Sequence, residues 1–109
     1  MSVPANIDML RPWEAIETSG KRAQRFSAQL ETTLPLTHVL HGLAVAAVAA
    51  RIDRDDVLFE VVGGEMPLVV VHLTAKKETD PRWPSTRFFR SWEDWVQEDM
   101  RPTHEDYAR

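Results

Sequence analysis

The chain has 109 residues, 43% of them hydrophobic and 28% charged, which is the composition of one folded domain rather than of a disordered segment. Because it contains no cysteine, disulfides, thiolate metal sites and cysteine nucleophiles are excluded. Thirteen basic residues against seventeen acidic ones give a net charge of -4, and since nucleic-acid binding needs clustered cations, we expect no nucleic-acid partner.

The ends and the apolar runs of the sequence predict neither a membrane partner nor export. The longest apolar run, Leu43 to Ala50, is far shorter than the roughly 20 residues of a membrane span. Residues 1–11 lack the basic start and the apolar core of a secretion signal. We therefore expect a cytoplasmic protein with an N-terminal arm at residues 1–11 and a single domain at residues 12–109.

An amphipathic helix, interrupted once, is predicted after the arm. Pro12 suits the first position of a helix, and Glu14 and Glu17 follow where the helix dipole favours acidic side chains. Gly20 interrupts the pattern. Beyond it, apolar residues recur three and four positions apart, at Ala23, Phe26, Leu30 and Leu34. Pro35 then ends the helix.

Three strands follow, at residues 43–52, 57–62 and 68–74, and residues 86–89 are expected to add a short strand at the edge. The first of these runs is rich in alanine, which favours a helix, but a turn-forming cluster leads from it directly into the next strand. An antiparallel meander explains this order of segments better than a helix at residues 43–52 does. Ser91 then begins a C-terminal helix with a capping-box pattern, an apolar stripe at Trp92, Trp95, Val96 and Met100, and an end at Arg101-Pro102.

The predicted fold is α+β: a three- to four-stranded antiparallel meander with an N-terminal and a C-terminal helix packed on one face. Pairing Val62 with Leu68 places Phe59 and Val71 on the face that the helices cover. The other face is also largely apolar, and its members are Leu43, Val45, Ala47, Ala49, Arg51, Leu58, Glu60, Val62, Leu68, Val70 and His72. The arm or the loop around Trp83 could cover it. Otherwise a second copy is the simplest cover, and we expect a homodimer.

His72 is the strongest candidate for chemistry. In the predicted register it lies beside Leu58, one strand from Arg51 and diagonal to Glu60. A histidine near a carboxylate and a guanidinium on an apolar face can act as an acid or base, or bind an anion. The simpler interpretation is a histidine paired with Glu60 at a dimer interface, because buried polar groups normally find partners.

The other histidines carry weaker signals. His38-x-x-His41 has the spacing of two metal ligands on one helical turn. No carboxylate follows in the register of a known zinc motif, and Gly42 marks a loop. We therefore expect neither a metal nor a cofactor.

Candidate binding residues lie in the long loop before residue 86 and in the C-terminal tail. Trp83, between two prolines and next to Arg82, can anchor a partner or simply plug the edge of the sheet. His104 can assist a site at His72 or dock the terminus. Trp83, Arg82 and His104 are therefore the candidate binding residues.

Five short segments in the second half of the chain, taken in order, resemble segments of a family of small bacterial proteins of unknown function. They are Asp53–Phe59, Val70–Thr74, Asp80–Pro84, Ser91–Trp95 and Met100–Tyr107. The resemblance implies no activity, substrate or catalytic residue. The alanine-rich stretch after Gly42 differs from the more basic strand of that family.

The sequence as a whole favours a binding or interaction module, homodimeric and without catalysis, whose partner is a second copy or another protein. The alternative is a small enzyme or ligand-binding protein with a site around His72, Glu60 and Arg51.

Overall fold

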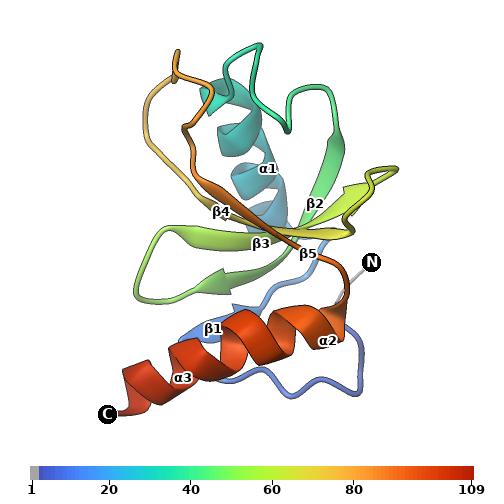
Figure 1. The fold of residues 1–109 in the computed structure, drawn as a ribbon, viewed down its shortest axis with the longest axis vertical. Coiled ribbons are helices and arrows are strands. Elements are labelled where there is room, and N and C mark those ends of the chain that lie inside the picture. Colours follow the sequence, from blue (N-terminus) through green and yellow to red (C-terminus); the bar gives the residue numbers. More distant parts are fainter. Residues whose placement is uncertain (1–2) are drawn as a thin grey trace.

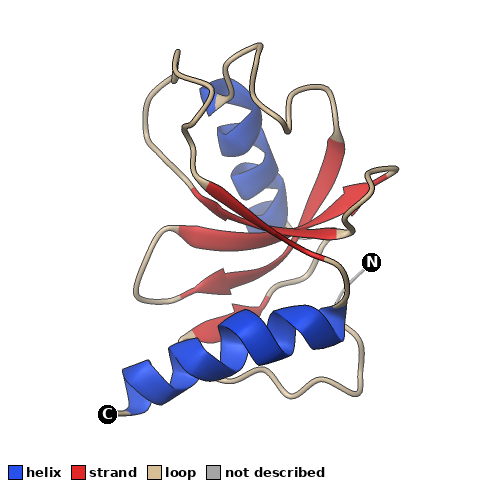
Figure 2. Cartoon of the chain, in the orientation of Figure 1, coloured by secondary structure: helices blue, strands red, loops and turns tan. Residues whose placement is uncertain are grey.

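A five-stranded antiparallel sheet forms the centre of the computed structural model, which describes residues 3–109 (Figures 1 and 2). The strands lie side by side in chain order: β1 (Trp13–Ala15), β2 (Ala44–Arg51), β3 (Asp56–Val62), β4 (Leu68–His72) and β5 (Thr86–Phe89). The α+β class, the meander and the edge strand at residues 86–89 are confirmed. The count of three to four strands is too low, because β1 was not predicted.

The N-terminal helix begins later than predicted. α1 spans Lys21–Thr33, whereas Trp13–Ala15, assigned above to the start of a helix, form β1. The carbonyl of Pro12 accepts a hydrogen bond from the N–H of Ile52 at 2.9 Å, which extends the pairing of β1 with β2. A helical segment of fewer than ten residues before Gly20 has little stability of its own. Pairing with β2, which buries the Trp13 side chain, therefore determines the conformation.

The two helical regions lie on opposite faces of the sheet, so the prediction that both pack on one face is wrong (Figure 1). α1 covers the face that includes Phe59, Val69 and Val71. The C-terminal helix consists of α2 (Trp92–Trp95), the π-helical segment η1 (Val96–Met100) and α3 (Arg101–Ala108). It covers the other face through Trp95 and Met100. None of the described helices combines the length and the apolar character needed to cross a bilayer.

The C-terminal helix occupies the second face because of the short connection after β5. Phe89, the last residue of β5, belongs to the apolar cluster of that face, and the helix begins only three residues later, at Trp92. The N-terminal arm completes the cover with Val3, Ile7, Met9 and Leu10. This face is therefore not available for the dimer contact that the sequence analysis placed there.

The strand register differs from the predicted one in two places. Leu68 lies opposite Glu60 rather than Val62, a shift of two residues that leaves the faces of β3 and β4 unchanged. In β2, the pairing with β3 skips from Ala47 to Ala49. This bulge adds one residue and exchanges the faces beyond it. Ala47 therefore lies on the face of Phe59 and α1, whereas the prediction placed it on the opposite face, and Val48 lies on the face that the C-terminal helix covers.

The C-terminal helix has the predicted cap but passes its predicted end. The Ser91 hydroxyl accepts the N–H of Asp94 at 3.0 Å, and the Asp94 carboxylate accepts the N–H of Arg90 at 3.1 Å. Beyond the cap, the N–H of Arg101 bonds to the carbonyl of Val96, the wide turn of a π-helix. This turn leads into Pro102 at the beginning of α3, where a proline is tolerated, so the helix continues to Ala108.

Candidate functional site

His72 is paired with Asp56, a residue that the sequence analysis did not select. The two residues lie opposite each other on β4 and β3, and Nδ1 of His72 is 2.6 Å from Oδ1 of Asp56. The second carboxylate oxygen of Asp56 lies 3.8 Å from Nη1 of Arg51. Half of the His72 side chain is exposed, against 18% for Asp56. The carboxylate thus engages Nδ1, and Nε2 is the nitrogen left for a ligand.

A cavity of about 240 Å³ adjoins this pair and is lined by Asp56, Val70, His72, Ser85, Thr86, Arg87 and Asp99. Asp99 reaches it from the π-helical segment η1, an irregularity that often accompanies functional sites. Burial raises the pKa of Asp99, although a hydrogen bond from Thr103 and the charge of Arg87 act in the opposite direction. The cavity therefore combines an oriented imidazole, a carboxyl group of raised pKa and an exposed guanidinium.

Glu60 does not take part in this cluster. It lies opposite Leu68, four residues along β3 from Asp56, which corresponds to about 13 Å of extended chain. The two-residue shift of register explains the difference, because it places Asp56 where the predicted pairing placed Leu58. Arg51 does lie in the cluster, and its guanidinium also binds Asp53 through two hydrogen bonds of 2.8 Å. That contact lowers the pKa of Asp53.

The remaining candidates each have separate contacts. Arg82 binds the carboxylate of Asp80, with Nη2 2.6 Å from Oδ2, and this hydrogen bonding lowers the pKa of Asp80 to about 2. Trp83, beside it, is 47% exposed. His104 donates from Nδ1 to the carbonyl of Arg11 at 2.6 Å and so joins the C-terminal helix to the arm.

His38 and His41 do not form a ligand pair. His38 is buried, with Nε2 2.9 Å from the carbonyl of Pro84, and its Nδ1 accepts the N–H of Leu40 at 3.0 Å. His41 is exposed. In the part of the chain that the structure describes, no group of three or more histidine, aspartate or glutamate side chains is arranged to hold a metal.

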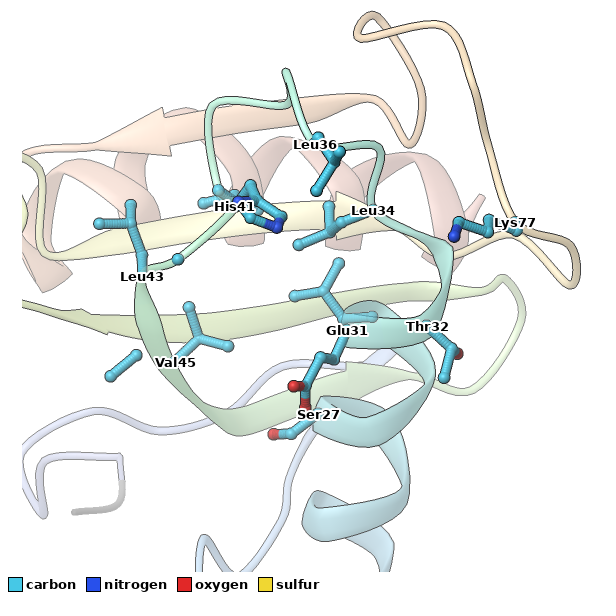
Figure 3. Close-up of a pocket in the computed structure, with 13 residues that line it drawn as sticks. Ser27, Glu31, Thr32, Leu34, Leu36, His41, Leu43, Val45 and Lys77 are labelled. Carbon is cyan, nitrogen blue, oxygen red and sulfur yellow. The ribbon is translucent and has the colours of Figure 1, made fainter.

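A larger cavity, of about 820 Å³, lies between α1 and the beginning of β2 (Figure 3). We call it the groove. Its apolar lining comes from α1, from the loop after it and from the first residues of β2: Leu30, Leu34, Leu36, Leu40, Leu43 and Val45. Glu31, His41 and Lys77 add charged or polar atoms, and Figure 3 shows Lys77 on a separate loop. The sequence analysis missed the groove, although apolar residues in the loop at 34–40 are a signal for it.

The outer edge of β2 is open beside the groove. Val61 donates its N–H to the carbonyl of Pro67 at 2.8 Å, on the β4 side of β3. Successive residues of a strand direct their backbone groups to alternate sides. Glu60 and Val62 therefore face β2, and Val45, which lies opposite Val61, directs its N–H and C=O away from the sheet.

β1 covers only the second half of this edge. Ala15 lies opposite Ala49, and the N–H of Ile16 bonds to the carbonyl of Val48 at 3.1 Å. Ala47 is fully buried, so its backbone is not accessible to another strand, and within the described residues the outer side of β2 is open only at residues 44–46. We call this segment the free edge of β2.

Comparison of the chain with models of protein families, with curated proteins and with solved structures finds no match. The resemblance of the second half of the chain to small bacterial proteins therefore stays a prediction. A function has to be inferred from the geometry of the groove, of the free edge and of the Asp56–His72 pair.

Proposed function

We propose that the protein is a cytoplasmic binding module that accepts an extended apolar segment of a protein partner along the free edge of β2. The observation that carries this proposal is an unpaired, uncharged strand edge next to an apolar groove. Strand edges are normally protected by lysine, proline or a covering element, because an unprotected edge pairs with other chains. Residues 43–50 contain neither a charged residue nor a proline.

The groove supplies what an added strand needs beyond backbone pairing. Each backbone hydrogen bond contributes only about 1 kcal/mol net, so backbone pairing with Val45 alone gives weak binding. Alternate side chains of the added segment point to the face of the sheet that carries α1. There they meet Leu34, Leu43 and the side chain of Val45. Burial of apolar surface at about 25 cal/mol per Å² then supplies most of the affinity.

A titration followed by amide NMR tests the proposal. The probe is a synthetic peptide of alternating valine and threonine with a lysine at each end. We expect shifts at residues 34–47 and in the second half of α1, and their loss in Ala44→Lys, which places a charge on the free edge at an exposed position. Ala15→Lys is the matched control, an exposed alanine on the neighbouring strand β1. Shifts spread over the whole sheet, or shifts that survive Ala44→Lys, contradict the proposal.

Val45→Pro provides a second, backbone-specific variant. The N–H of Val45 makes no bond to β3, so a proline there removes only the group that an added strand would use. Val45→Ala keeps that N–H and shortens only the side chain in the groove. We expect the proline variant to lose the peptide-induced shifts and the alanine variant to keep them at a higher peptide concentration.

The alternative function is a small enzyme or ligand-binding protein that uses His72, with Asp56 in the role first assigned to Glu60. The 2.6 Å contact between Nδ1 and the carboxylate supports this alternative, because a carboxylate that orients an imidazole leaves Nε2 ready to accept a proton. Acylation of the imidazoles by diethyl pyrocarbonate tests the pair, with the exposed His41 as internal reference. We expect Asp56→Asn to change the acylation rate of His72 relative to that of His41. An unchanged ratio rules out an activated imidazole.

A further inference from the structure

We infer that the polar cavity beside the C-terminal helix is an esterase site, in which Ser85 is the nucleophile, His72 is its general base and Asp56 positions the imidazole. All three residues line the cavity of about 240 Å³. The substrate class is a small, uncharged ester of a carboxylic acid. This inference is independent of the free edge of β2, and it adds a nucleophile to the alternative function.

Strand pairing places the three residues in one row across β3, β4 and β5. Asp56 lies opposite His72. On the other side, the N–H of His72 bonds to the carbonyl of Ser85 at 3.0 Å, one residue beyond the pairing of β4 with β5. Directly opposite residues of an antiparallel sheet carry their side chains on the same face, with Cβ atoms about 4.5–5.5 Å apart. The imidazole therefore stands between a carboxylate and a hydroxyl.

The two neighbours of the imidazole leave its nitrogens with different tasks. Oδ1 of Asp56 lies 2.6 Å from Nδ1 of His72, so Nε2 is the nitrogen that can take the proton of the serine. Ser85 is exposed, and its hydroxyl is accessible to a substrate. A carboxylate, an imidazole and a hydroxyl in this order activate a serine for acyl transfer on unrelated folds and in any chain order.

The backbone next to Ser85 supplies a donor for the oxyanion that forms during acyl transfer. Because the backbone carbonyl of Ser85 faces β4, the backbone of Thr86 faces the outer side of β5, which is an edge strand. Within the described residues, the N–H of Thr86 has no acceptor, and Thr86 lines the same cavity. The N–H of the residue after the nucleophile is a donor that α/β-hydrolases use for the oxyanion.

The remaining charged groups of the cavity already have partners, which favours an uncharged substrate. Asp99 accepts a hydrogen bond from the hydroxyl of Thr103 at 2.9 Å. The guanidinium of Arg87 lies 3.4 Å from the carboxylate of Glu98. At about 30 Å³ for each water molecule, the cavity has the volume of about eight waters. A short acyl group fits this space, and the leaving alcohol lies at the exposed side of the cavity.

The reaction is the hydrolysis of an ester in two steps. Oγ of Ser85 attacks the carbonyl carbon while its proton passes to Nε2 of His72. The bond from that carbon to the alcohol oxygen breaks, and the alcohol leaves with the proton from Nε2. Water then attacks the acyl-serine with the same proton transfers, which releases the carboxylic acid and restores the hydroxyl.

The first experiment measures the hydrolysis of p-nitrophenyl acetate by the absorbance of the released p-nitrophenolate. We expect Ser85→Ala and His72→Ala to lower kcat/KM by about 100-fold. Ser19→Ala removes an exposed serine outside the cavity and is the matched control, which should keep the wild-type value. Peptide mass spectrometry after an acid quench should locate the acetyl group on Ser85.

Asp56→Asn tests the positioning role of the carboxylate. Because Asp56 acts on the imidazole and not on the ester, we expect kcat to fall by about tenfold or more while KM stays unchanged. A rise in KM with an unchanged kcat contradicts this role.

A second experiment tests the contact between residues 72 and 85 without turnover. Because the chain has no cysteine, Ser85→Cys introduces a single thiol. A thiol beside an imidazole ionises more readily, so we expect Ser85→Cys to react with iodoacetamide at about pH 6 roughly tenfold faster than Ser19→Cys. Addition of His72→Ala to Ser85→Cys should remove this difference.

The outcomes separate this inference from the proposed function. A Ser85→Ala chain that hydrolyses the ester as fast as the wild type overturns the serine nucleophile, and so does an acetyl group found only on other residues. Equal alkylation of the two thiols overturns the contact with His72. Ala44→Lys should keep the wild-type hydrolysis, and the peptide titration decides separately whether the free edge accepts a strand.

Discussion

His38 holds the loop that forms one wall of the groove, and its replacement by alanine should destabilise the whole domain. The imidazole is buried and connects the N–H of Leu40, at 3.0 Å, with the carbonyl of Pro84, at 2.9 Å. Each bond contributes about 1 kcal/mol, and its loss leaves a buried backbone group without a partner, which costs roughly 1–3 kcal/mol. We expect His38→Ala to lower the free energy of unfolding by about 2–4 kcal/mol, with a fall in Tm of roughly 10–20 °C.

Urea unfolding followed by far-ultraviolet circular dichroism measures this loss, and His41→Ala provides the control. His41 stands three residues later in the same loop but is exposed, so its replacement should change the free energy of unfolding by no more than about 0.5 kcal/mol. Equal unfolding midpoints for the two variants would refute the structural role of His38. A matching loss of peptide binding in His38→Ala, measured under native conditions, would link the loop to the groove.

Three further predictions concern the second face and the charged groups. Trp95→Ala should lower the free energy of unfolding by about 3–5 kcal/mol, as measured by urea unfolding. Trp95→Phe should lower it by less than half of that, because the phenyl ring keeps apolar contact and removes an indole N–H that has no partner among the described residues. Burial raises the pKa of Asp99 in the folded chain. The protonated carboxyl therefore contributes fully to stability at pH values below the pKa of the unfolded chain, and this contribution is lost as the pH rises through the pKa of the folded chain. Asp99→Asn should therefore be more stable than wild type at neutral pH and no more stable near pH 3, as measured by unfolding across pH; the same difference at both pH values would contradict this assignment. The Asp80 carboxyl should titrate at about 2 by carbon-13 NMR, and Arg82→Gln should bring its midpoint toward the ordinary 3.8; an unchanged midpoint would disprove the pairing.

The strands that the sequence predicts well are those bounded by strong turns. Turn-forming residues at 53–56 and 63–67 separate β2, β3 and β4, and the structure confirms all three strands. In β2, the alanines favour a helix, but pairing with β3 outweighs their propensity. Hairpin connections therefore carry more information here than residue preferences do.

The arrangement of the helices and the face pattern of β2 could not be predicted in the same way. β1 has only 3 residues, too few to show a strand period, and its stability comes from contacts with Arg51 and its neighbours that are distant in sequence. The bulge between Ala47 and Ala49 leaves no mark in residues 44–50, which are all alanine or valine. Both features depend on tertiary contacts.

The candidate polar site was half predicted. His72 and Arg51 were selected because they are polar residues on apolar strands, and the structure places both beside Asp56. Asp56 was missed because it was assigned to the turn before β3, and a register error of two residues put Leu58 opposite His72 and left Glu60, on the diagonal, as the nearest carboxylate. The face of a residue is more predictable than its opposite partner, since a shift by two preserves the face and changes the partner.

The free edge of β2 follows from the way the chain leaves β1. Because β1 is antiparallel to β2, its continuation past Ile16 would run along residues 47–44 and close the edge. Instead the chain turns away and enters α1, whose 13 residues extend about 20 Å across the face of the sheet rather than beside the strand. α1 thus reaches the beginning of β2, where a longer β1 would also reach. The helix covers one face of the sheet there and leaves the edge of β2 unpaired. The outer backbone groups of Val45, a partly exposed residue, stay available until another strand pairs with them, so the peptide titration of the wild-type chain and of Ala44→Lys is the measurement on which the functional interpretation depends.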